Sequence, residues 1–242
     1  MSEFYILVDY DNFEQNTCFT VDQSAIMIME IVRNLDQKSD FFNSASQLQH
    51  VHIILYGGWF FYEKFSYKAQ DLSRELVINF SQLYRIKSGI QIDIQCEMAY
   101  GIFSLGKSRH FYATYRKYPA NFSIDPRYVK CCDDGDICVD FLRDWLVDKK
   151  CCYCSKENVN LFVSFGQKMV DSMIFCDLHF LSQSKENIIA VVSSDDDLIP
   201  IIFQENMTCD KIYHVLTLSA HGYLFTRFYD KIKPTNYKSI TW

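Results

Sequence analysis

The sequence lacks several features that would place it in a special class. Its 242 residues contain only four prolines, and 49% are hydrophobic and 22% charged, as in ordinary globular domains, which excludes disordered and collagen-like proteins. No apolar run approaches the roughly 20 residues that a membrane-spanning helix requires. The first residues, Met1 to Asp9, contain neither a basic stretch nor a cleavage site, so we expect no signal peptide. A cytoplasmic protein without a membrane segment is the prediction.

The chain also has no excess of basic residues. It carries 24 Lys and Arg against 30 Asp and Glu, which gives a formal net charge of −6. A protein that coats nucleic acid gains its affinity by neutralising phosphates, and this balance argues against that class. A local basic segment within an acidic chain remains compatible with the composition.

The order of apolar segments predicts an α/β fold. Short apolar runs of strand length alternate with segments of helix length, which is typical of a largely parallel sheet covered by helices. The length fits one large domain on the usual range of roughly 100–200 residues, and no internal repeat is present. We expect strands at 4–8, 51–56, 90–96, 161–165, 188–192 and 212–218, and helices at 22–37, 63–85, 169–183 and 197–206.

Residues 119–160 interrupt this alternation. They contain Pro119, Pro126 and Gly135 together with a cluster of six cysteines. We therefore expect a small Cys-rich insertion within a single domain that spans residues 1–242.

Acidic residues follow two of the expected strands and open one of the expected helices. Asp9 ends the first run, the segment Asp195-Asp196-Asp197 follows the run at 188–192, and Asp171 lies at the start of the helix after 161–165. Ligands bind beyond the carboxyl ends of strands in open parallel sheets, so these acids are expected to meet at one edge.

Such a meeting of carboxylates is unfavourable without a cation. Two carboxylates about 4 Å apart repel by roughly 4 kcal/mol at an effective dielectric constant near 20. Three or four together must take up protons or bind a metal ion. Mg²⁺ and Mn²⁺ prefer oxygen ligands and keep waters that can attack a phosphorus centre. The alternative is that each Asp only caps a helix or a turn.

Three sequence blocks resemble the signature blocks of the NYN domains, which are PIN-like metal-dependent ribonucleases. The blocks are Val8-Asp9-Tyr10-Asp11-Asn12-Phe13, Lys168-Met169-Val170-Asp171 and Ser193-Ser194-Asp195-Asp196-Asp197-Leu198-Ile199-Pro200. Their order and spacing agree with the family pattern, and the match extends over residues 5–217. Met169 and Ser194 stand where the family often has glycine.

This resemblance implies a PIN-like, Rossmann-like fold and an endoribonuclease that uses Mg²⁺ or Mn²⁺. It assigns Asp9, Asp171, Asp195 and Asp197 as metal-binding acids, and Asn12 as a residue that orients the first loop or the substrate. Lys168 either contacts the scissile phosphate or pairs with a carboxylate.

The cysteine cluster predicts a structural zinc site. Six of the ten cysteines lie between residues 131 and 154, and four thiolates satisfy tetrahedral Zn²⁺. The candidate ligands are Cys132, Cys138, Cys151 and Cys154, although the doublets 131/132 and 151/152 leave the choice within each pair open. Buried free thiols and a redox pair are the alternatives.

Residues 107–130 combine basic and aromatic side chains. The segment contains six Lys or Arg, six Phe or Tyr and one acid, a mixture that can follow a phosphate backbone and stack on unpaired bases. The candidate RNA contacts are Lys107, Arg109, Arg116 and Lys117. A solvated edge strand whose aromatic residues face the core is the alternative.

Two other functions compete with a nuclease. Asp9-Tyr10-Asp11 also suits a phosphatase of the haloacid-dehalogenase type, although Phe13 stands where that family has a small β-branched residue. A PIN-like module that binds RNA without cutting it would have the same fold. Whether the chain works with a regulatory protein or with a second copy of itself stays open.

Overall fold

The computed structural model describes residues 3–12, 20–45, 49–106, 111, 114–119, 163–167, 169–216 and 232–241, with the backbone alone at 115–119 and 163–167. The chain divides into two compact units. One contains residues 1–115 and 167–242, and the other contains residues 116–166. The Cys-rich segment 119–160, apart from Pro119, lies outside the described residues.

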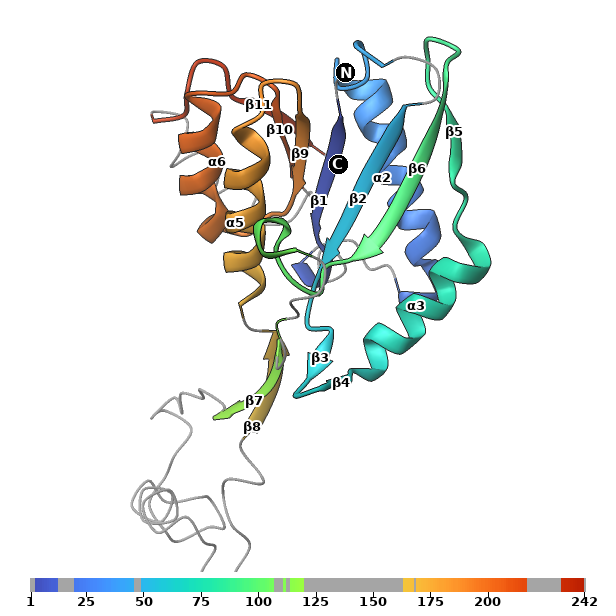
Figure 1. Cartoon of the computed structure of the whole chain (residues 1–242), viewed down its shortest axis with the longest axis vertical. Coiled ribbons are helices and arrows are strands. Elements are labelled where there is room, and N and C mark those ends of the chain that lie inside the picture. Colours follow the sequence, from blue (N-terminus) through green and yellow to red (C-terminus); the bar gives the residue numbers. More distant parts are fainter. Residues whose placement is uncertain are drawn as a thin grey trace, which may run out of the picture. The chain divides into compact units, whose positions relative to one another are not determined.

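The described part of the first unit is built on a seven-stranded sheet with the order β11-β10-β9-β1-β2-β6-β5 (Figure 1). All neighbouring strands are parallel except β5, which pairs antiparallel with β6. This confirms the predicted α/β class with a mostly parallel sheet. The strands are β1 (Phe4–Asp9), β2 (His50–Tyr56), β5 (Leu83–Arg85), β6 (Gln91–Met98), β9 (Ile188–Val192), β10 (Ile212–Leu216) and β11 (Lys238–Thr241).

Helices cover both faces of the sheet. Helices α2 (Ser24–Lys38) and α3 (Tyr67–Asn79) lie on one face, and α5 (Val170–Ser182) and α6 (Ile199–Asn206) lie on the other (Figure 1). Short 3₁₀ turns precede α2 (Val21–Gln23) and α6 (Asp196–Leu198), and a third lies at Phe103–Leu105.

The central strands separate two hydrophobic cores. In β1, Ile6 and Val8 face the α2 side, whereas Leu7 faces α5 and α6, and all three are fully buried. Alternate side chains of a strand point to opposite faces, so a strand between two helical layers must be apolar on both. The same alternation turns Asp9 toward the α5 side.

Two sequence predictions were wrong in their extent or placement. The predicted helix 63–85 is shorter, because residues 60–65 form a β3–β4 hairpin (Phe60–Phe61 with Lys64–Phe65) and residues 83–85 form β5. Ser66 fixes the helix start, since its side chain accepts a hydrogen bond from the Ala69 amide. The strand predicted at 161–165 is β8 (Val163–Gln167), which pairs with β7 (Tyr115–Pro119) in a separate two-stranded sheet.

Among the described residues, no helix combines the length and the apolar character needed to cross a bilayer.

Candidate metal centre

The sheet changes its direction of winding between β1 and β9. These strands are parallel neighbours, with Val8 opposite Val192, and the chain proceeds from β1 toward β2 but from β9 toward β10. The segments that follow β1 and β9 therefore lead to helices on opposite faces and diverge at the carboxyl ends of the two strands, which makes this a topological switch point. Asp9 ends β1 and Ser193 to Asp195 follow β9, so both lie at this switch point.

Three carboxylates converge there. One oxygen from each of Asp9, Asp171 and Asp195 lies within 4.8 Å of the others. Asp171 reaches the group from the first turn of α5, where the positive end of the helix dipole favours a negative charge. Asp171 thus reaches the other two acids from the first turn of a helix, as predicted. The strand that precedes this helix, β8, is not part of the seven-stranded sheet but pairs with β7.

Asp9 is the fully buried member of the group. The Ser193 hydroxyl donates to its Oδ2 at 3.0 Å, and the Asn12 amide donates to its Oδ1 at 3.4 Å. Burial, and then the charge of Asp171, raise the pKa of Asp9 to about 7, while the hydrogen bond from Ser193 acts in the opposite direction. A carboxylate in this setting gains from a neighbouring positive charge.

Ser193 also fixes Asp195. Its hydroxyl oxygen accepts a hydrogen bond from the Asp195 amide at 3.0 Å while donating to Asp9. The pattern of acids did not single out Ser193, although its place directly after a wholly buried strand is a signal that could have found it. A polar side chain that is itself fully buried at a strand end needs a partner there.

His214 supports the same turn from β10. Its Nε2 lies 2.8 Å from the Ser193 carbonyl, which only accepts, so Nε2 carries the proton. Its Nδ1 then accepts from the Tyr237 hydroxyl, 2.8 Å away. Burial lowers the pKa of His214 to about 4, and the imidazole is neutral at physiological pH.

Asn12 joins the segment that follows β1 to the segment that follows β9. Its side-chain oxygen accepts a hydrogen bond from the Ser194 amide at 2.9 Å. The amide after β9 is thereby tied to the first residues after β1, the kind of contact expected of a residue that orients the first loop.

The remaining described acids do not join the group. Asp197 is exposed, and its amide donates to Asp195 Oδ1 at 3.0 Å; its carboxylate is not among the three that converge within the described residues. Asp11 forms an ion pair with Lys68 and accepts from the Gly58 amide at 2.9 Å. Asp177, six residues along α5 from Asp171, accepts from the Tyr56 hydroxyl at 2.8 Å.

Several predicted residues lie outside the described part of the chain. Lys107, Arg109 and Lys168 are among them, as are all four proposed zinc ligands, Cys132, Cys138, Cys151 and Cys154. Arg116 and Lys117 lie on β7, of which the backbone alone is described.

The donor set fits a hard divalent cation. Three carboxylates within 4.8 Å of one another supply oxygen ligands of the kind that Mg²⁺ and Mn²⁺ bind. Each pair of ionised groups at that distance repels by roughly 3 kcal/mol at an effective dielectric constant near 20, and a divalent cation between them would add attractions to each carboxylate that outweigh this repulsion.

Comparisons with family models, with curated proteins and with solved structures found no match to this chain.

Proposed function

We propose that this chain is a metal-dependent endoribonuclease with a PIN-like fold of the NYN type. The observation that carries the proposal is the convergence of Asp9, Asp171 and Asp195 from three segments that are far apart in the sequence. These are three of the four acids that the NYN resemblance assigns to metal binding. Their place at a topological switch point is where open parallel sheets bind substrates.

A bound Mg²⁺ or Mn²⁺ would supply a water of lowered pKa and positive charge beside the scissile phosphate. Asp9, Asp171 and Asp195 would hold the cation, and Ser193 would keep the first and third of these carboxylates at a fixed spacing. Asn12 would hold the segments that follow β1 and β9 together while RNA binds.

The geometry favours a nuclease over a phosphatase of the haloacid-dehalogenase type. That chemistry needs the second acid of Asp9-Tyr10-Asp11 to act beside the first. Here Asp11 is held by Lys68 and the Gly58 amide, and it is not part of the converging group. A non-catalytic RNA-binding module shares the geometry and is separated by the assay below.

The rest of the proposal concerns residues whose side chains are not described. Lys107, Arg109, Arg116, Lys117 and Lys168 would contact RNA phosphates. The segment 119–160 would form a structural zinc module within the single domain, which metal analysis of purified protein tests. The cytoplasm is the compartment in which such cysteines stay reduced.

Cleavage of labelled RNA tests the function. Single-stranded RNA, duplex RNA and single-stranded DNA are each incubated with the full chain in Mn²⁺, Mg²⁺ or EDTA. Metal-dependent RNA cleavage that falls about 100-fold or more in Asp195→Asn is expected, since a carboxylate ligand supports several kcal/mol of catalysis. Asp196→Asn is the matched control, because Asp196 is an exposed neighbour outside the converging group.

The absence of cleavage by folded, zinc-loaded protein would contradict the proposal. RNA binding that is retained in Asp195→Asn would then favour the non-catalytic module.

A further inference from the structure

The β3–β4 hairpin extends from the carboxyl end of β2, at the same edge of the sheet as the metal centre (Figure 1). Two contacts tie the hairpin and the helix after it to the segment that follows β1. The Gly58 amide donates to Asp11 at 2.9 Å, and Lys68 of α3 forms an ion pair with the same carboxylate. Asp11 lies two residues after Asp9. The hairpin is therefore anchored beside the strand end that supplies the first metal-binding acid.

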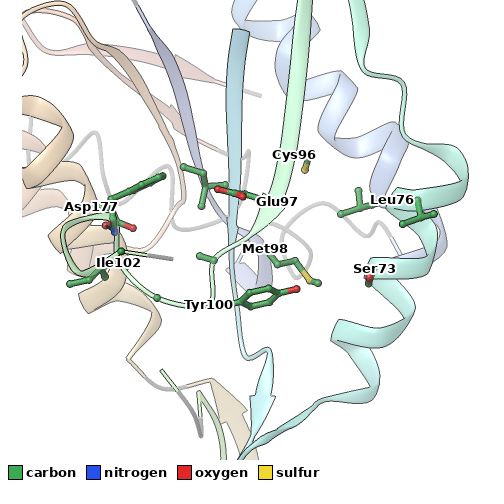
Figure 2. Close-up of a pocket in the computed structure, with 14 residues that line it drawn as sticks. Ser73, Leu76, Cys96, Glu97, Met98, Tyr100, Ile102 and Asp177 are labelled. Carbon is green, nitrogen blue, oxygen red and sulfur yellow. Dashed lines mark hydrogen bonds between the residues drawn. The ribbon is translucent and has the colours of Figure 1, made fainter. Parts of the chain in front are cut away.

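One side of the hairpin packs against the segment that follows β6. Phe60 and Phe65 are register partners, and their rings stack with centroids 4.9 Å apart. Tyr100, which Figure 2 shows just beyond the end of β6, has its ring centroid 5.5 Å from each of these two rings. Phe60 is buried in this arrangement. These three rings connect the hairpin to the sheet.

The other side of the hairpin and its tip face solvent. Phe61 and Lys64 are also register partners, and the alternation of side chains places them on the side opposite to Phe60 and Phe65. Tyr62 follows at the tip, where its ring meets that of Phe61 edge-on with centroids 4.9 Å apart. Tyr62 is 66% exposed, and Lys64 is exposed as well. The hairpin thus presents an aromatic ring and an ammonium group to solvent.

The backbone of Tyr62 is also unusual. Its φ is 55°, in the left-handed region that glycine, asparagine and aspartate normally occupy in turns. Among the described residues other than glycine, Met169 alone shares this conformation, and it directly precedes the helix that carries Asp171. Residues in sparsely populated backbone conformations concentrate at ligand sites. A ring that is mostly exposed buries little apolar surface on folding, so stability does not account for tyrosine at this turn.

The tip lies within reach of a strand held at the metal centre. Tyr62 follows Tyr56 by six residues, and Tyr56 is the register partner of Asp9. Six residues span at most about 20 Å even when fully extended. A nucleic-acid strand that crosses the acids therefore covers the separation with a few nucleotides.

We propose that the tip of the β3–β4 hairpin binds an unpaired base of the RNA, which stacks on Tyr62 while Lys64 contacts the phosphate backbone; this inference rests on the proposed nuclease function. Aromatic side chains stack on any base, because every base has a π face. A base inside a duplex is stacked on its neighbours and does not reach such a ring. The chain should therefore prefer single-stranded to duplex RNA.

RNA binding to the full chain tests the inference in buffer without Mg²⁺ or Mn²⁺, so that no strand is cut. Fluorescence anisotropy compares a labelled poly(U) oligonucleotide, its duplex with poly(A), and a strand with the same backbone but no bases. Tyr62→Asn should weaken binding of poly(U) about 5-fold or more, the usual loss for one stacked base. It should leave the affinities for the duplex and for the abasic strand unchanged.

Three further variants make the test specific. Tyr62→Phe keeps the ring and should bind as the unaltered chain does. Tyr67→Asn is the matched control, because Tyr67 is 87% exposed but belongs to α3 and has no positive φ. Lys64→Gln should weaken binding of poly(U) and of the abasic strand alike, since it removes a phosphate contact. Asparagine enters the left-handed conformation readily, so Tyr62→Asn should keep the hairpin, and its denaturation midpoint should not fall.

The outcomes separate this inference from the proposed function. No binding of poly(U), equal binding by Tyr62→Asn, or an equal loss on the abasic strand would overturn the base site even if RNA is cleaved. A loss that is confined to the strand with unpaired bases, and that Tyr62→Phe does not show, would support the site even if no RNA is cleaved.

Discussion

At the scale of single residues, the Ser193 hydroxyl has the largest consequence for the metal centre. One oxygen donates to Asp9 and accepts from the Asp195 amide, so it sets the spacing of two carboxylates. Burial drives Asp9 toward the protonated form, and the Ser193 contact opposes this by stabilising the carboxylate. Cation binding requires the carboxylate, and Ser193 therefore prepares the site.

Ser193→Ala should weaken Mn²⁺ binding about 10-fold or more, because a hydrogen bond to a charged group contributes roughly 1.5–3 kcal/mol. Calorimetric titration with Mn²⁺ measures this. The matched control is Ser194→Ala, since the contact of Ser194 with Asn12 is made by its backbone amide, which alanine retains. Unchanged Mn²⁺ affinity in Ser193→Ala would show that the acids hold their positions without it.

His214 should remain neutral down to about pH 4, because burial lowers its pKa to about 4. An unfolded chain binds this proton near pH 6.5. The stabilisation that His214 provides is therefore complete above pH 6.5 and is lost as the pH falls toward 4. Nitrogen chemical shifts followed with pH measure both the pKa and the Nε2–H tautomer. An imidazole that titrates near pH 6.5 would contradict the buried pair of hydrogen bonds.

At the scale of elements, the start of helix α5 places Asp171. The residue before the helix, Met169, adopts the left-handed conformation with φ 70°, which side chains other than glycine enter at a cost. This is the position at which the NYN pattern often has glycine. Glycine enters this conformation without that steric cost, so we expect Met169 to store backbone strain.

Met169→Gly should raise the free energy of unfolding by about 0.5–1 kcal/mol, since relief of left-handed strain exceeds the entropy that glycine gains on unfolding. Chemical denaturation measures it. Met207→Gly is the control, because Met207 is also exposed at a helix end but has φ −68°. A loss of stability in both variants would show that Met169 is not strained.

The sequence predicts the central elements better than the edges. The strand predicted at 188–192 is β9 with the same bounds. Its five residues are all apolar, and a short run of this kind is typical of a strand that is buried on both faces. The predicted helix 63–85 failed at both ends, since the hairpin at 60–65 and the edge strand β5 depend on pairing partners that local periodicity does not contain. Strand β11 was missed for the same reason.

The candidate site likewise contains residues that local sequence indicates and residues that depend on how the strands pair. The three acids could be predicted because each lies next to a strand or helix that the sequence pattern indicates. The supporting contacts of Ser193 and His214 could not, because they join β9 to β10 through side chains whose meeting depends on sheet register.

At the scale of the whole molecule, strand order creates the site. The order β9-β1-β2 places Asp9 and Asp195 at adjacent strand ends, and α5 brings Asp171 to them from the layer above. We infer that these three carboxylates form a single cation site. No one of the three segments can do so alone.

Mn²⁺ binding to the zinc-loaded full chain, followed by electron paramagnetic resonance, tests whether the three carboxylates hold one cation. We expect saturable binding that Asp171→Asn weakens at least about 10-fold, since one of the three anionic ligands is lost. Asp196→Asn should bind as the unaltered chain does. Equal Mn²⁺ binding in the unaltered chain and in Asp171→Asn, or no saturable binding in either, would contradict the account.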